Sequence, residues 1–216
     1  LVIINGILSF MLTPGSAWLS VAGTGTEASM FWPAFFNPTY FPSLLMRTLA
    51  CMSLAGVYAL VTYSMVDDDK LAATKKVMVR WSANWLMPMV ALLPVGLGLM
   101  YLCMNTGSRQ ILELGFSTIG SGMFTVVTRV AMLTVLTTIT IAGVTYFFAY
   151  LYPKDLSVGH AISLLGLAVV ATGSTEFARE TIRKPYVIHG HMYSNGVRKA
   201  DVPKLNQSGY LAQSIW

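Results

Sequence analysis

The sequence predicts an all-α membrane protein, a polytopic bundle of about five transmembrane segments. Of its 216 residues, 55% are hydrophobic and only 11% are charged, whereas soluble domains carry roughly 25% charged residues. Long stretches without Asp, Glu, Lys or Arg approach or exceed the ~20 apolar residues that cross a bilayer as a helix. They do not alternate in polarity as the strands of a membrane barrel do. These stretches are residues 48–66, 81–108, 130–153 and 156–175.

Five apolar segments are expected along the chain. The first is short and closes at Pro14 and Gly15. The prolines of "FFNPTYFPS" are expected to keep the second helix from starting before residue 44. Pro88 and Pro94 are expected to kink the third helix. The expected ranges are 1–13, 44–65, 81–104, 122–150 and 157–177.

The segments suggest a bundle over residues 1–177 and a polar tail over 178–216. The first residues already belong to an apolar helix, without a Met or a basic leader. A secretory signal peptide would show that basic leader and a cleavage site. We therefore expect another membrane subunit, or chain upstream, to supply further helices.

Basic residues are unevenly distributed between the loops. Segments 66–80 and 151–156 together hold five Lys and Arg residues, whereas 14–43 has none. The positive-inside rule then places the first two in the cytoplasm. The tail falls outside the bacterial inner membrane, although it is basic. We expect its charges to pair with a carboxylate, a haem propionate or a partner protein.

Two arginines lie within the apolar segments, near their predicted outer ends. They are Arg47 in "SLLMRTLACM" and Arg129 in "TVVTRVAMLT". Ionisable residues inside a membrane are costly and are candidates for function. The alternative is that each guanidinium reaches the interface on its long stem. Glu176 and Glu180, one turn apart at the end of the last helix, could face the two arginines.

The remaining ionisable and sulfur-containing residues suggest little chemistry by themselves. His189 and His191 would share a face only on a strand, so a metal or haem ligand pair and a plain partner contact both stay open. Cys51 and Cys103 are expected to be small buried hydrophobes, and no CxxCH motif attaches a c-type haem. No nucleic-acid-binding motif is present. An interfacial belt is expected from Trp32, Phe35, Phe36, Tyr40, Phe41, Trp81, Trp85, Tyr146, Tyr150 and Tyr152.

Four motifs in order resemble subunit I of the cytochrome bd-type quinol oxidases. They are "INGILSFMLTPG" (4–15), "FNPTYFPSLLMRTLA" (36–50), "FTVVTRVAM" (124–132) and "ETIRKPY" (180–186). In that family they correspond to an Asn-Gly helix with a Pro-Gly turn, two helices that bear haem ligands, and a helix-terminal Glu-x-x-Arg signature. The resemblance covers nearly all of residues 1–190. It implies quinol or quinone and haem b near the outer face.

The departures from the family bear on the haem. Arg47 stands where the family has its His ligand, and Ala131 where it has its Met ligand. An arginine cannot ligate iron because it stays protonated. The resemblance therefore implies a subunit that has lost part of its haem coordination, with haem b at an interface with another chain. No metal ligand is expected in this chain.

The resemblance also assigns roles to the polar residues. Glu180 and Arg183 are the expected catalytic pair, with Glu180 as a proton acceptor. The expected cofactor-binding residues are Arg47, Arg129, Glu176, Arg179 and Lys184.

The expected function is quinol oxidation in a respiratory complex that exchanges electrons with c-type haems outside the membrane. The basic tail would contact that c-type cytochrome, and the chain would not reduce oxygen alone. The alternative is a haem-free scaffold that anchors multihaem cytochromes. A transporter would show internal repeats with broken helices, and none is evident in the sequence.

Overall fold

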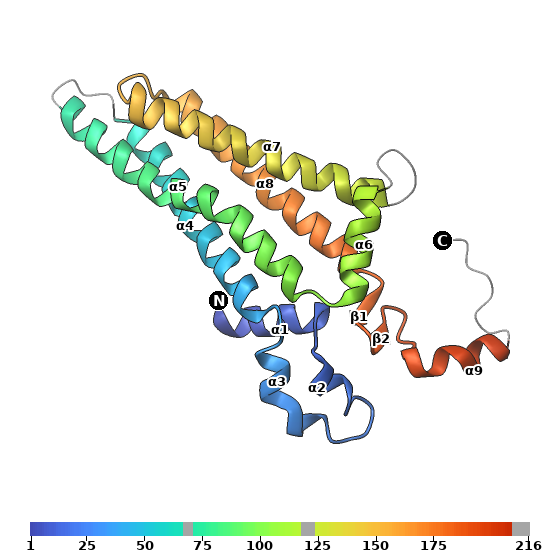
Figure 1. The fold of residues 1–216 in the computed structure, drawn as a ribbon. Coiled ribbons are helices and arrows are strands. Elements are labelled where there is room, and N and C mark those ends of the chain that lie inside the picture. The colour runs from blue at the N-terminus through green and yellow to red at the C-terminus, as the bar shows by residue number, and fades with distance from the viewer. Residues whose placement is uncertain (67–70, 118–123, 209–216) are drawn as a thin grey trace.

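The computed structural model describes residues 1–66, 71–117 and 124–208. In these residues the chain forms an elongated all-α bundle, as predicted (Figure 1). Four helices are long and apolar enough to cross a membrane. They are α4 (Tyr40–Ser64), α5 (Ala72–Cys103), α7 (Phe124–Tyr146), which continues into the π-helical turn η3 (Phe147–Leu151), and α8 (Val158–Arg183).

The long helices pack chiefly as the pairs α4–α5 and α7–α8, and α4 also contacts α8. Their shared core includes Val57 and Leu60 of α4, Val79 and Leu86 of α5, and Leu164 of α8. Only 12% to 28% of the most apolar window of each helix is buried. The remaining apolar surface is large for a protein surrounded by water, which is consistent with a bilayer around the bundle.

The first apolar segment forms α1 (Val2–Leu12), which is 11 residues long. At 1.5 Å per residue it measures about 16 Å, against about 30 Å for the hydrocarbon core. The Asn5 amide donates to the Tyr40 carbonyl (2.9 Å) at the start of α4. Leu12 packs against Val127 and Ile182. Helix α1 thus crosses one end of the bundle (Figure 1), which we call the α1 end; the opposite end is the Lys75 end.

Three helix boundaries differ from the sequence-based expectation. Helix α4 begins at Tyr40, not near residue 44, because Pro42 lies in the first turn, where a missing N–H costs little. Helix α5 begins at Ala72 and so includes the basic residues that were expected to form a loop. Helix α8 continues to Arg183, through the expected boundary at residue 177. One helix runs through Pro88 and Pro94, and the expected kink there stays a prediction.

Shorter elements join and extend the long helices. Helix α6 occupies part of a stretch that was expected to be a loop, and two short strands pair in antiparallel fashion after α8. At the α1 end lie α2 (Ser16–Leu19), η1 (Glu27–Met30), α3 (Phe31–Phe35), α6 (Thr106–Ser117), β1 (Tyr186–Ile188), β2 (Met192–Tyr193), η4 (Lys199–Asp201) and α9 (Val202–Gln207).

The two cysteines are free. Cys51 is exposed on α4 and Cys103 is partly buried, so the expectation that both are buried is wrong for Cys51. A small, weakly polar side chain is compatible with a helix surface that faces lipid.

Candidate functional site

The last two turns of α8 carry a cluster of charged side chains. The Arg179 Nε donates to Glu176 Oε2 (2.7 Å), and Arg179 Nη2 donates to Glu180 Oε1 (2.8 Å). Arg183 Nη2 donates to Glu180 Oε2 (2.6 Å). The pairs Glu176–Arg179 and Glu180–Arg183 form because residues three apart share one face of a helix. Arg179 also reaches its neighbour in the chain, Glu180. Lys184 ends the helix and is exposed.

Glu180 lies between two guanidinium groups. Arg179 binds one carboxylate oxygen, and Arg183 binds both. Two cations at hydrogen-bond distance favour the charged carboxylate over the protonated acid. A carboxylate held in this way is a poorer proton acceptor than the sequence led us to expect. The pair is part-exposed, so its contribution to stability is at most about 1 kcal/mol.

Arg47 lies in the second turn of α4. Its Nε is 3.4 Å from Ser43 Oγ, and Ser43 donates to Asn5 Oδ1 (2.8 Å). Arg47 is therefore linked through one hydroxyl to α1. Among the residues that the structure describes, no ion pair joins Arg47 to a carboxylate.

Arg129 is exposed on the second turn of α7. It neighbours Val127, which packs against Leu12 and Ile182 at the α1 end. In the described ranges Arg129, too, forms no ion pair. Glu176 and Glu180 are paired within α8, so they do not face the two arginines as expected. Within the described residues, neither guanidinium group is neutralised by a carboxylate.

A buried polar network fixes α1 against the start of α4. Asn37 Nδ2 donates to Ser9 Oγ (2.9 Å) and to the Ala34 carbonyl (3.2 Å). Asn37 Oδ1 accepts from Thr39 Oγ1 (3.2 Å) and Thr13 Oγ1 (3.3 Å). Because buried polar groups are costly unless they are bonded, this network determines how α1 lies across the bundle. It holds the first two family-like motifs together.

Asn105 connects three distant segments and was not singled out from the sequence. Its Oδ1 accepts from the Ser108 N–H (2.8 Å) and so caps α6. Its Nδ2 donates to the Leu12 carbonyl (3.0 Å) and contacts His189 Nδ1 (3.1 Å). Since that amide nitrogen can only donate, His189 Nδ1 is the acceptor. An Asn directly before a helix start is the one signal in the sequence that could have pointed to it.

The two histidines face different elements. His189 is half-buried, and its backbone N–H donates to the Met11 carbonyl (3.0 Å). The His191 ring packs edge-on against Trp18, with centroids 5.5 Å apart. Gly190 between them has a φ of 81°, so the chain turns and the rings diverge. Among the described residues there is no group of three His, Cys, Asp or Glu side chains that could hold a metal.

The protonation state of the His189 ring should control how firmly β1 and β2 attach to the bundle. Burial is the main cause that lowers the pKa of His189 below its ordinary value of ~6.5, and the nearby charge of Lys199 is a smaller cause. The neighbouring Tyr186 has a raised pKa because of burial and Tyr193. When β1 and β2 are attached, His189 therefore binds fewer protons than when they are detached. The stabilisation of the attached state is complete above pH ~6.5 and is lost as the pH falls through the lowered pKa of His189. Hydrogen exchange, corrected for intrinsic rates, should show protection of 186–193 falling between pH 7.5 and 5.

The variant His189→Gln tests this origin, because glutamine keeps an acceptor for Asn105 but does not titrate. It should remove most of the pH dependence. The matched control His191→Gln should keep it. An unchanged pH response in His189→Gln would show that another group is responsible.

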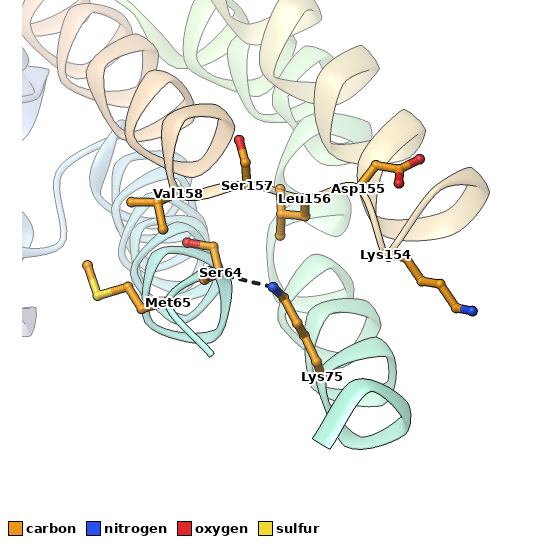
Figure 2. A pocket seen from close by; sticks show the side chains of 8 residues that line it. All are labelled: Ser64, Met65, Lys75, Lys154, Asp155, Leu156, Ser157 and Val158. Atoms are coloured by element: carbon orange, nitrogen blue, oxygen red, sulfur yellow. Dashed lines mark hydrogen bonds between the residues drawn. The ribbon is translucent and has the colours of Figure 1, made fainter. Parts of the chain in front are cut away.

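The Lys75 end contains a cavity of about 480 Å³. Figure 2 shows the Lys75 ammonium group directed at the end of α4, and Nζ donates to the carbonyls of Ser64 (3.4 Å) and Val66 (3.0 Å). The Ser64 carbonyl is one that a helix end leaves without a partner, and Val66 follows directly after the C-cap residue Met65. Lys75 is therefore engaged in helix capping. The α1 end is the better candidate site, because Arg47 and Arg129 form no ion pair there within the described residues.

Comparison with known proteins gives no match. No protein-family model, no curated protein and no solved structure is significantly similar to the chain. What the sequence and structure establish is an all-α protein with four helices suited to a membrane.

Proposed function

We propose that the protein is a bd-like membrane subunit of a bacterial respiratory electron-transfer complex that binds quinol or quinone at the α1 end. This end would face outward from the inner membrane. Electrons would pass there to or from the c-type haems of a partner cytochrome, which the basic tail would contact. The observation that supports the proposal is that the four family-like motifs meet at this end.

Contacts join all four motifs directly or through one neighbour. Asn5 of the first motif donates to Tyr40 of the second. Arg183 of the last motif lies 4.0 Å from the Met11 sulfur of the first. Val127 of the third packs against Leu12 and Ile182. Motifs that are far apart in the chain thus lie together at one end of the bundle, as a shared site would require.

The three histidines of the chain all have contacts within the described structure. Haem iron needs axial side chains such as His or Met. His160 takes part in the cap of α8 at the Lys75 end, His189 Nδ1 is bonded to Asn105, and His191 packs on Trp18. In the proposal, haem b is held at an interface with another membrane subunit.

The roles that we propose for the charged residues follow from their contacts. Arg47 and Arg129 form no ion pair in the described part of the chain, and they would donate N–H groups to a quinone oxygen or a haem propionate. Arg179 and Lys184 add positive charge at the end of α8, while Glu176 orients Arg179. For Glu180 to accept a proton from quinol, Arg183 would have to move away from its carboxylate, because both oxygens are engaged.

Arg47→Leu in the intact complex tests the proposal. The loss of one charge-assisted hydrogen bond costs about 1.5–3 kcal/mol, so quinol-dependent haem reduction should slow about tenfold or more. Arg80→Leu is the matched control, since Arg80 binds the Tyr150 carbonyl (3.2 Å) at the Lys75 end. A complex without any haem b spectrum and without quinol-dependent reduction would contradict the redox role.

A haem-free scaffold that anchors peripheral multihaem cytochromes is the second candidate. It is favoured by the contacts of the three histidines, each of which packs against or bonds to another residue of this chain. A scaffold predicts that Arg47→Leu leaves electron transfer unchanged and lowers only the stability of the complex. The same spectra and a thermal unfolding curve distinguish the two.

A further inference from the structure

The connection between α1 and α4 buries polar side chains and exposes aromatic ones, the reverse of a segment in water. Asn37 and Thr39 are 2% and 0% exposed, whereas Trp32 and Phe36 are 65% and 48% exposed. A segment in water would bury the rings and expose the amide and hydroxyl groups. This reversal indicates that the surroundings of the segment are less polar than water.

The exposed rings form one continuous surface, which we call the aromatic face: Phe31, Trp32, Phe36 and Phe41. The Trp32 and Phe36 rings are stacked with centroids 5.9 Å apart, and Phe36 is stacked on Phe41 at 6.2 Å. Phe31 is 56% exposed and Phe41 66%. The aromatic face therefore extends from α3 to the first turn of α4, a candidate membrane span.

The length of α4 determines the depth of this surface. Its 25 residues measure about 37 Å at 1.5 Å each, about 7 Å more than the hydrocarbon core. Phe41, the second residue of the helix, therefore lies near the boundary between acyl chains and headgroups. Aromatic rings are enriched at that level. Residues 14–43 contain no Lys or Arg, so attraction to anionic headgroups would not hold the segment.

We propose that the aromatic face binds the lipid interface of the leaflet at the α1 end, so that α3 is an anchor lying on the membrane. The partner is the zwitterionic headgroup and upper acyl region, not a particular lipid. The anchor would hold α1 and the polar network of Asn37 at a fixed depth. This inference does not depend on the proposed quinol chemistry.

Tryptophan fluorescence with brominated lipids tests the anchor. One variant keeps Trp32 and replaces the other tryptophans with Phe, and a matched variant keeps only Trp18, which is partly buried against Phe10 and His191. Each protein, with the subunits that co-purify, is placed in phosphatidylcholine vesicles. Bromines near the headgroup should remove more than about half of the Trp32 emission, and bromines near the bilayer centre less, as expected for an interfacial ring.

The control and the contrary outcomes are distinct. Trp18 should lose less emission to either lipid, and protection of Trp18 from aqueous iodide shows that the α1 end is folded. Strong iodide quenching of Trp32 without an effect of bromolipids would overturn the proposal in favour of a surface in water. Protection from both quenchers would overturn it in favour of a protein partner.

Discussion

Gly56→Leu should force α4 and α5 apart and lower the free energy of unfolding by about 2–3 kcal/mol, the cost of overpacking a tight contact. A Cβ at Gly56 would lie 2.9 Å from the Ser82 carbonyl oxygen and 3.1 Å from the Leu86 nitrogen. Both are backbone atoms of α5 and cannot turn away. Small residues at such crossings let membrane helices approach closely.

Gly98→Leu is the matched control for this prediction. It lies on α5, and a Cβ there would meet nothing within 4 Å. Tryptophan fluorescence during thermal unfolding in detergent measures both variants. The Gly56 variant should melt several degrees below the Gly98 variant, and equal melting temperatures would contradict the close crossing.

Asn37→Ala should also destabilise the protein by about 2–3 kcal/mol, because several buried groups each lose one of their hydrogen bonds. The Ser9 and Thr39 hydroxyls and the Ala34 carbonyl each lose a hydrogen bond. Water cannot easily replace these bonds because Thr39 is 0% exposed. The measurement is again thermal unfolding, with a shift of roughly 5–10 °C for a chain of this size.

Asn206→Ala is the corresponding control, since Asn206 is exposed in α9. It should have the same melting temperature as the unaltered protein. If Asn37→Ala also has that melting temperature, the polar network does not hold α1. Limited proteolysis of the α1 segment gives a second measure, because a released α1 should be cut faster.

The spans could be predicted from the sequence because length and lack of charge suffice to define them. The runs 48–66 and 81–108 lie almost entirely within α4 and α5. The helix ends could not be predicted as well. Pro42 is a helix breaker in general but not in a first turn, and this depends on where the first turn falls. The α8 extension to Arg183 depends on ion pairs that form only once that helix exists.

The candidate site was predictable in composition but not in contacts. The sequence placed Arg47, Arg129 and the charged residues of α8 near one end of the bundle. It did not reveal that Glu180 is shared by Arg179 and Arg183, because the carboxylate could equally have faced another helix. It also gave no reason to connect Asn105 with His189, since that contact spans 84 positions of the chain.

The contacts of Asn105 have a consequence for biosynthesis. Its side chain joins the Leu12 carbonyl to His189, and His189 is synthesised only after all four long helices. The junction therefore cannot close while the chain is being inserted into the membrane. Until then α6 begins without the contact between Asn105 and His189, while α1 is held by its contacts with α3, α4 and Val127 of α7. The α1 end is therefore completed only after the four long helices have been synthesised.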